Sequence, residues 1–471
     1  MARKRKNRFL EHIEITDIAP EGRGVGRIDG RVIFVERAVP GDVVTALLDK
    51  SKESYAKGKI HILEEASPLR QDAFCEHFGK CGGCKWQFLA YEKQLEFKHK
   101  IVEDALRRTG KIYDGHINPI IGSVKDRYYR NKLEFSFSNA RYLTPEEIAS
   151  GAVFEQENAL GFHAPRLFSK IVDVKACHLM ESFQDDIRNS IRVYAEEHDL
   201  TFYDIRKKEG LLRNLIVRNT VKGQWMVIMI FGQNDEENVK GLMDHLVGKF
   251  PQLDSLSYVI NTKNNDTIFD LEVINYYGKD HITEYLEELQ FKISPKSFFQ
   301  PNPTQALTLY GVIRELANLQ GNELVYDLYT GTGSIAQFLA RYCKKVVGIE
   351  EVADSIKDAC YNAEQNGLTN CTFLVGDVRK EFNDHFIAEH GKPDLLITDP
   401  PRSGLHADVV DKIVEIAAPR VIYVSCNPVT QARDLNKMLH LYEIVTIQPV
   451  DMFPQTHHVE NVVLLKIKDD K

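Results

Sequence analysis

The chain has 471 residues, a length that predicts two to four domains, and its 43% hydrophobic and 27% charged residues are typical of a globular protein. No apolar run approaches the length of a membrane span, and no apolar stretch follows the basic N-terminus. We therefore expect a cytoplasmic protein without a membrane span or a secretory signal. The net charge of -8 argues mildly against a nucleic-acid partner, although the distribution of charge decides more than its sum.

Residues 1–66 predict a small β-barrel of the oligonucleotide-binding (OB-like) type. Between residues 10 and 65, apolar and polar residues alternate in about five short runs that glycines separate. Such a barrel either binds RNA or is purely structural, and the fold alone does not decide between these. A basic run precedes it, which is either a solvated tail or an arm for phosphates. The run consists of Arg3, Lys4, Arg5, Lys6 and Arg8.

Residues 67–290 predict a central α+β domain that begins with a cysteine-rich loop. Eight cysteines in a long cytoplasmic chain do not indicate a disulfide framework, and their grouping favours a metal site or catalysis. Cys75, Cys81 and Cys84, with the distant Cys177 as a fourth ligand, suit either zinc or a 4Fe–4S cluster. The spacing does not choose between these two, and it is not the spacing of radical enzymes.

The same region contains a predicted strand on which cations lie beside aromatic residues. The segment VKDRYYRNKLEFSF carries Arg127, Tyr128, Tyr129, Arg130, Asn131 and Lys132. Aromatic rings beside cations suit stacking on unpaired bases, and the plain alternative is a strand with an exposed basic face. Stacking hides the ring of a base in folded RNA, so an enzyme that acts on that ring has to flip the base out.

From residue 291 to residue 471 the pattern is that of a doubly wound, Rossmann-like α/β domain. Apolar runs such as ELVYDLY, KKVVGIE, PDLLITDPP and RVIYVSC alternate with helical segments, which predicts a parallel sheet. In such sheets, ligands bind at the carboxyl ends of the strands. Residues that bind a cofactor or take part in catalysis are therefore expected at the ends of these strands.

The first of these strands leads into a glycine turn that opens a helix. Gly331 and Gly333 permit a tight turn and a close approach of backbone to ligand, but the third glycine of a dinucleotide site is missing. Glu350 ends the next strand, where it is placed to bind ribose hydroxyls, and Asp377 follows a further strand on the side expected for an adenine. This set favours S-adenosylmethionine over NAD as the cofactor.

Later strand ends carry residues that suit covalent catalysis. Cys426 follows a buried strand in an Asn-Pro turn, and the plain alternative to a nucleophile is a buried structural cysteine. Glu460 immediately precedes the last strand and suits a proton-abstracting base, with Asp451 and His457 as weaker rivals. Asp399 ends a neighbouring strand, where it suits the cofactor or a pyrimidine edge, or simply caps its own turn.

The motifs SFFQPN, DLYTGTGS, TDPPRSGL, SCNPVTQARDL and HHVEN resemble the signature of the RNA uracil-5 methyltransferases, and the resemblance covers nearly the whole chain. It implies that Cys426 adds to carbon 6 of uracil, that carbon 5 takes the methyl group, and that Glu460 removes the proton from carbon 5. It also implies a TRAM domain at the N-terminus and an iron–sulfur cluster on the four cysteines. The implied cofactor contacts are Gln300, Tyr329, Ser334, Glu350, Asp377 and Asp399.

The resemblance also implies a substrate, and the sequence argues against other classes of protein. The ribosomal branch of the family carries both the barrel and the cluster, so a uridine of 23S rRNA is expected, with tRNA as the alternative and no obligatory protein partner. Amino-group methyltransferases place an aromatic residue where Arg402 stands, and RNA cytosine-5 enzymes carry a second cysteine that residues 395–410 lack. A rival of another class is a non-catalytic RNA-binding iron–sulfur protein, against which the presence of Cys426 and Glu460 argues.

Overall fold

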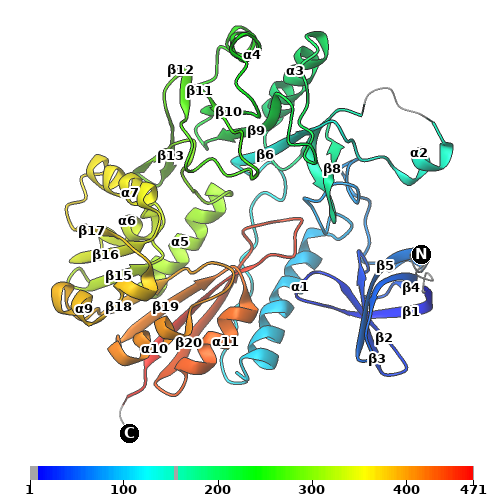
Figure 1. The fold of residues 1–471 in the computed structure, drawn as a ribbon. Helices are drawn as coiled ribbons and strands as arrows, with labels where there is room; N and C mark the ends of the chain where they lie inside the picture. Colours follow the sequence, from blue (N-terminus) through cyan, green and yellow to red (C-terminus); the bar gives the residue numbers. More distant parts are fainter. Residues whose placement is uncertain (1–8, 153–156, 470–471) are drawn as a thin grey trace.

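The computed structural model describes residues 9–152 and 157–469, so the basic run at residues 3–8 lies outside the described part. Along the chain a small barrel comes first, a mixed sheet follows, and a doubly wound sheet forms the C-terminal part (Figure 1). Within the described ranges, no helix is both long enough and apolar enough to cross a membrane.

The N-terminal barrel closes from five strands in the order β1-β2-β3-β5-β4, which confirms the predicted barrel. Its strands are β1 (Phe9–Ile18), β2 (Gly24–Ile28), β3 (Arg31–Glu36), β4 (Val43–Ser51) and β5 (Tyr55–Glu65). Successive side chains of a strand point to opposite faces, so the alternation in the sequence sends every second residue inward. Ile13, Ile33 and Val35 are fully buried there and form the aliphatic core of the barrel.

A helix links the barrel to the C-terminal sheet. The elements of this link are α1 (Tyr91–Asp104), the π-helical turn Ala105–Thr109 that continues it, and α11 (Pro428–Met438), on which both pack. Trp86, Leu89 and Ile101 are buried in the same core as the C-terminal strands. Figure 1 shows α1 beside α11, between the barrel and the sheet. The segment of residues 86–109 therefore positions the barrel relative to the sheet.

The central part is a seven-stranded mixed sheet. Its strands, in spatial order, are β12 (Ile274–Gly278), β11 (Ser255–Ile260), β10 (Trp225–Phe231), β9 (Leu212–Asn219), β6 (Lys132–Ser138), β7 (Ala159–Ala164) and β8 (Leu167–Asp173). Its helices are α2 (Pro145–Ser150), α3 (Phe183–Glu197) and α4 (Glu236–Lys249). Ile187 of α3 and Leu242 of α4 are fully buried in the core that these helices share with the sheet. The domain boundaries at residues 66 and 290 stay predictions.

A hairpin of β13 (Ile282–Leu286) and β14 (Leu289–Ile293) leads into the C-terminal sheet, whose order is β17-β16-β15-β18-β19-β21-β20. Its strands are β15 (Leu324–Leu328), β16 (Lys345–Glu350), β17 (Cys371–Val375), β18 (Leu395–Thr398), β19 (Arg420–Ser425), β20 (Tyr442–Val450) and β21 (Glu460–Ile467). The strands from β17 to β19 pair in parallel, whereas β21 runs antiparallel to both of its neighbours. This arrangement confirms the predicted doubly wound domain.

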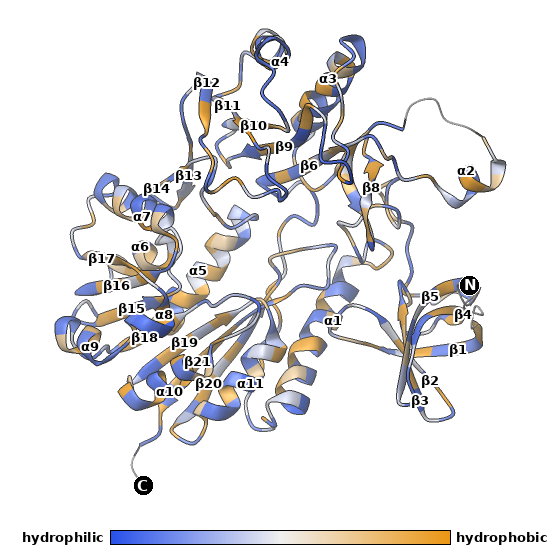
Figure 2. Cartoon of the chain, viewed as in Figure 1, coloured by the Kyte–Doolittle hydropathy of each residue, from blue (hydrophilic) through white to orange (hydrophobic). Residues whose placement is uncertain are grey.

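Helices cover the C-terminal sheet with their apolar sides. Besides α11, they are α5 (Pro303–Ala317), α6 (Ser334–Ala340), α7 (Ala353–Gln365), α8 (Val378–Glu381), α9 (Asp384–His390) and α10 (Ala407–Ile416). Figure 2 shows hydrophobic and hydrophilic residues alternating along α10 and α11, as expected of helices with one buried side. In α10, Val409, Val410 and Ile413 are the buried residues on that side.

Candidate active site

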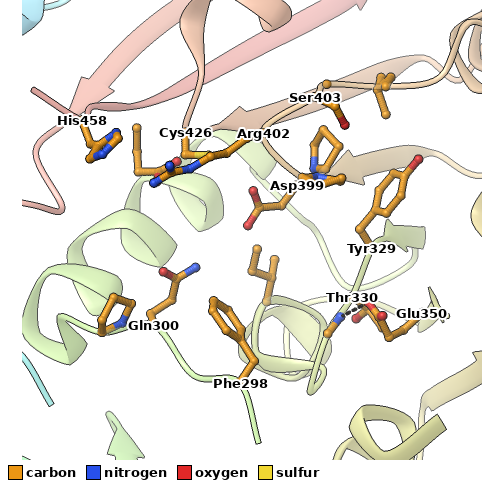
Figure 3. A pocket seen from close by; sticks show the side chains of 18 of the residues that line it. Phe298, Gln300, Tyr329, Thr330, Glu350, Asp399, Arg402, Ser403, Cys426 and His458 are labelled. Carbon is orange, nitrogen blue, oxygen red and sulfur yellow. Dashed lines mark hydrogen bonds between the residues drawn. The ribbon is translucent and has the colours of Figure 1, made fainter. Parts of the chain in front are cut away.

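The carboxyl edge of the C-terminal sheet opens into a cavity of about 1340 Å3. Its walls come from the ends of β15, β16, β18 and β19 and from the loops that follow them, where ligands of doubly wound sheets bind. In Figure 3, the side chains of Gln300 and Asp399 point into the same space, and Arg402 lies between Asp399 and His458. Lys85, far from the sheet in sequence, also lines the cavity.

The turn after β15 owes its shape to a left-handed backbone. Tyr329, Gly331 and Gly333 have φ angles of 66°, 57° and 73°. A Cβ atom on Gly333 would lie 2.8 Å from the ring of Phe373, so only glycine fits there without a shift. The backbone nitrogen of Gly331 donates to Glu350 at 3.1 Å, which holds the turn against the end of β16. The turn thus brings backbone close to any ligand at this edge.

The sheet register places the Cys426 thiol beside the Glu460 carboxyl. In the antiparallel pairing of β19 with β21, Ser425 lies opposite Asn461. One residue further along this ladder, Cys426 leaves β19 where Glu460 begins β21. Both side chains line the cavity. Burial and, to a smaller extent, the neighbouring Glu460 carboxyl together raise the pKa of the Cys426 thiol to about 11.

Three carboxyl groups lie close enough together to oppose one another's ionisation. Burial raises the pKa of Asp399 to about 7, and the charge of Asp327 adds to this rise. Burial also raises the pKa of Glu460 well above its usual value, and Asp399 raises it further. A positive charge that enters the cavity would stabilise the ionised forms of all these groups. The cavity therefore favours a cationic ligand.

Arg402 supplies positive charge beside Cys426. It lowers the pKa of Cys426 and of Glu460, against the larger effect of burial on both groups. The side-chain amide of Asn427 donates to the carbonyl oxygen of Arg402 at 2.9 Å. Asn427 also accepts from the backbone nitrogen of Val429 at 3.2 Å and so caps α11. The residue after Cys426 thus fixes both the loop of Arg402 and the helix that follows.

Two histidines that line the cavity with Cys426 have lowered pKa values and are therefore neutral at neutral pH. Burial and, to a smaller extent, nearby cations such as Lys98 together lower the pKa of His457 to about 4. Burial lowers the pKa of His458 to about 3, with His457 and Arg402 adding to the effect. An imidazole with so low a pKa is a weak base, so His457 is poorly suited to remove a proton. Asp451, the other rival of Glu460, is fully buried in an ion pair with Lys98 at 2.6 Å.

The cavity brings together the residues that the sequence singled out at separate strand ends. Those that line it are Gln300, Tyr329, Gly331, Ser334, Glu350, Asp377, Asp399, Cys426 and Glu460. Gly333 does not line the cavity but lies in the same turn, where its backbone nitrogen donates to Thr330 at 2.9 Å. The hydroxyl of Ser334 is hydrogen bonded to that of Tyr310 at 2.8 Å. The chemical roles of these residues stay predictions.

The four cysteines predicted as metal ligands lie near the same cavity. Burial, with the thiols of Cys177 and Cys75, raises the pKa of Cys81 to about 11. Burial, with the thiol of Cys81, raises the pKa of Cys84 to about 11 as well. The thiols therefore occupy one neighbourhood. Within residues 9–152 and 157–469, however, no three Cys, His, Asp or Glu side chains are placed to hold one metal ion. The metal site stays a prediction.

Sequence reasoning did not single out several residues that line the cavity. Phe298 precedes Gln300 in the SFFQPN motif, and 63% of its surface is exposed although it is a large aromatic residue. His458 lies in the HHVEN motif, and Lys85 follows the cysteine loop. The first two could have been found from their place in a motif. Lys85 reaches the cavity only through the folding of the chain.

Comparisons with known proteins agree with this architecture. Residues 90–468 match the family described as tRNA (Uracil-5-)-methyltransferase, and residues 8–61 match the TRAM domain. Two relatives named as uncharacterized RNA methyltransferases, from Bacteroides thetaiotaomicron and Porphyromonas gingivalis, are each 49% identical to this chain. They cover 96% of it, and the chain covers 100% and 99% of their lengths.

A solved structure extends the comparison to three dimensions. The tRNA (uracil-54, C5)-methyltransferase of Pyrococcus abyssi, in complex with S-adenosyl-L-homocysteine, is 26% identical and superposes with a TM-score of 0.74. The superposition covers 97% of this chain and 100% of that one. The expected resemblance to RNA uracil-5 methyltransferases is thereby confirmed. The chain belongs to the tRNA (uracil-5-)-methyltransferase family and begins with a TRAM domain.

Proposed function

We propose that this protein transfers a methyl group from S-adenosylmethionine to carbon 5 of a uridine in RNA. The observation that carries the proposal is that the Cys426 thiol and the Glu460 carboxyl are neighbours at the ends of adjacent strands. They line the same cavity as the glycine turn and Glu350. The family and the TRAM domain support RNA as the substrate. The related Pyrococcus abyssi structure, solved with S-adenosyl-L-homocysteine, supports the cofactor.

The reaction uses a cysteine because carbon 5 of uracil is a poor nucleophile. The Cys426 thiolate adds to carbon 6, and the electron pair of the 5,6 double bond moves into an enolate. Carbon 5 then attacks the methyl carbon of the sulfonium, and S-adenosylhomocysteine leaves with the electron pair of the broken C–S bond. The Glu460 carboxylate takes the proton from carbon 5, the double bond re-forms, and the thiolate leaves carbon 6.

The electrostatics of the cavity suit these roles. Burial makes Cys426 a weak acid in the free protein, so the thiolate forms only when positive charge lies nearby. Arg402 supplies part of that charge, and the sulfonium supplies more. The raised pKa of Glu460 makes its carboxylate a stronger base than an exposed glutamate, which favours removal of the carbon 5 proton.

In this proposal the turn after β15 and the neighbouring strand ends hold the cofactor. Gly331 and Gly333 allow the backbone to approach it, Glu350 binds the ribose hydroxyls and Asp377 faces the adenine. The remaining contacts are Gln300, Tyr329, Ser334 and Asp399. In the family that the motifs resemble, Asn often stands at the position of Ser334 and in some members at that of Asp377, so these two contacts differ in donor and acceptor from those of such members.

For the RNA, we propose a uridine of 23S rRNA, with tRNA as the second candidate. The resemblance to the ribosomal branch, which combines the barrel with the four cysteines, supports rRNA. The structural likeness to a tRNA enzyme from Pyrococcus abyssi supports tRNA. The two candidates can be distinguished by incubating the purified protein with labelled S-adenosylmethionine and either RNA, and then analysing the nucleosides. Labelled 5-methyluridine from rRNA alone would support the first candidate, and label from tRNA alone the second.

Covalent catalysis has its own test. Glu460→Gln still allows methyl transfer but not proton removal, so a protein–RNA adduct should accumulate on denaturing gels. Cys426→Ala should form no adduct and lose turnover while it still binds RNA, whereas Cys360→Ala, which changes an exposed cysteine, should behave as wild type. Turnover by Cys426→Ala would refute the mechanism. No methyl transfer by the wild-type protein to either RNA, with RNA binding intact, would favour a non-catalytic RNA-binding protein.

We also propose that Cys75, Cys81, Cys84 and Cys177 hold a 4Fe–4S cluster, with zinc as the alternative. Cys75 and Cys177 raise the pKa of Cys81, and Cys84 raises that of Cys177, so the four thiols lie near one another. They form a suitable donor set, because both metals bind cysteine as thiolate. The cluster would cross-link the loop before Lys85 to the segment after β8. Iron and sulfide content and visible absorption of anaerobically purified protein, compared with Cys84→Ser, test this. Zinc in place of iron would establish the alternative, and no bound metal would refute both.

A further inference from the structure

A second cavity, of about 610 Å3, opens on the other side of Cys426, between the barrel and the C-terminal sheet. Phe34, Tyr55 and Lys57 line it from the barrel. Cys426 and Arg402 line both this cavity and the first one. The two cavities therefore meet at the proposed nucleophile, one with the cofactor turn and the other with the barrel.

The barrel wall of this second cavity carries an aromatic pair. β3 and β5 pair in parallel, with Phe34 opposite Lys57. Their sequence neighbours Ile33 and Ala56 are fully buried in the barrel core, so Phe34, Tyr55 and Lys57 lie on the outward face. The rings of Phe34 and Tyr55 have centroids 6.2 Å apart and meet edge to face at 73°. Aromatic faces turned outward toward a cavity suit stacking on planar groups.

Lysines surround this pair. The ammonium groups of Lys50 and Lys52 lie 5.8 and 5.7 Å from the centroid of Tyr55, and that of Lys57 lies 5.8 Å from the centroid of Phe34. Lys57 also donates to Glu21 at 3.3 Å, so its charge is partly neutralised. Lys50 and Lys52 are exposed and supply the excess of positive charge beside the rings. Rings beside cations match the base and the phosphate of a nucleotide.

The barrel is fixed against the active site, so the second cavity is present before any ligand binds. A Cβ atom on Gly22 would lie 2.8 Å from Cβ of His457, which shows how closely the barrel approaches the loop before Glu460. The indole nitrogen of Trp86 donates to the Gly22 carbonyl at 3.2 Å. On its other side, the barrel is held by ion pairs of Arg166 with Glu36 and Asp49.

We propose that the second cavity binds an unpaired nucleotide next to the target uridine, with its base stacked on the face of one ring of the Phe34–Tyr55 pair and edge-on to the other, and its phosphate near Lys50 and Lys52. The proposal rests on the proposed function, because it takes Cys426 as the point that the target uridine reaches. A nucleotide joined to that uridine has to lie close by, and in the first cavity the glycine turn after β15 is assigned to the cofactor. The adjoining cavity brings Phe34, Tyr55 and Lys57 of the barrel together beside Cys426, which suits such a nucleotide.

The test fixes the RNA register first and then reports stacking. A single-stranded oligoribonucleotide carries 5-fluorouridine at one position, where fluorine cannot be removed from carbon 5 and the adduct with Cys426 therefore persists after methyl transfer. The fluorescent base 2-aminopurine replaces one neighbour at a time on either side. In the adduct with wild-type protein, 2-aminopurine should be quenched at one of the adjacent positions, because stacking on an aromatic ring quenches it.

Variants identify the stacking surface. Phe34→Ala/Tyr55→Ala should lose the quenching and weaken binding of the oligonucleotide about tenfold, with the chemical step of the bound complex unchanged. Lys50→Ala/Lys52→Ala should weaken binding and flatten its dependence on salt. The matched control is Phe9→Ala, which removes an exposed aromatic residue of the same barrel outside this cavity.

The outcomes separate this proposal from the proposed function. Absence of any 5-fluorouridine adduct in wild-type protein would count against the covalent mechanism. An adduct that forms normally, with no adjacent position whose quenching depends on Tyr55 and Phe34, would overturn the second cavity as a nucleotide site. Equal weakening by Phe9→Ala would overturn it too, because the effect would then belong to the barrel as a whole.

Discussion

The buried ion pair of Lys98 and Asp451 joins α1 to the loop that precedes Glu460, and removing its cation tests how firmly that loop is held. Lys98 Nζ lies 2.6 Å from Asp451 Oδ1 and donates to the carbonyl of Phe453 at 3.0 Å, and neither charged side chain is exposed. The Tyr91 hydroxyl donates to the second oxygen of Asp451 at 2.8 Å. Lys98→Met removes the charge and keeps a similar volume.

We expect Lys98→Met to lower the free energy of unfolding by about 3–5 kcal/mol, because Asp451 would stay buried without its counter-charge. Its two remaining donors, the Tyr91 hydroxyl and the backbone nitrogen of Phe453 at 2.9 Å, favour the lower end of this range. The double variant Lys98→Met/Asp451→Leu removes both charges and should recover most of the loss.

Urea unfolding followed by the fluorescence of Trp86 measures this change locally. The chain has two tryptophans, so Trp225→Phe leaves Trp86, which is fully buried and whose carbonyl accepts from Gln94 of α1 at 3.1 Å. The control is Lys93→Met on the same helix, where an exposed ion pair predicts a change below about 0.5 kcal/mol. A loss below about 1 kcal/mol for Lys98→Met, or a double variant no more stable than the single one, would refute the reasoning.

Three further predictions follow from the raised carboxyl pKa values. Binding of the sulfonium should lower the pKa values of Asp327 and Asp399, which are about 7, and so release protons from both groups. Calorimetry in buffers of different ionisation enthalpy measures this release, and a binding heat that does not depend on the buffer would contradict it. Resolution of the covalent adduct should slow as pH falls through the raised pKa of Glu460, and a flat pH profile in single-turnover assays would contradict this. Burial raises the pKa of Glu284 to about 7, so its folded form holds a proton more tightly than the unfolded one. Glu284→Gln should therefore add up to about 3 kcal/mol of stability at pH 8 and almost none at pH 4, as denaturant midpoints would show.

Much of the candidate site could be predicted because its residues end strands of one parallel sheet. Glu350, Asp399 and Cys426 each come at or directly after an apolar run, and parallel pairing brings the ends of these runs to a single edge. Glu460 joins them for another reason, since β21 runs antiparallel and presents its first residue to the same edge. The alternation of residues 10–65 likewise determines which side chains fill the barrel.

Contacts between distant segments left no local signal. Lys98 and Asp451 are 353 residues apart, and the pattern of α1 does not indicate that the helix packs on α11. The contact of the barrel with His457 likewise depends on three distant segments, which carry Gly22, Trp86 and His457. For the cysteines the sequence predicts more than the structure contains. Their spacing predicts a set of metal ligands, but in the described residues the neighbouring thiols are not placed so that three of them surround one ion.

The loop before Glu460 is also the reason why the barrel cannot be treated as a separate RNA-binding attachment. The carbonyl of Gln455 accepts from the backbone nitrogens of Lys85 and Trp86, at 2.8 and 3.1 Å, and Gly22 packs against His457. Deleting the barrel would uncover Trp86 and His457 and loosen the loop, so catalysis and RNA binding would be lost together. Substitutions on the outward face, such as Tyr55→Ala, leave these contacts in place and therefore separate the two effects.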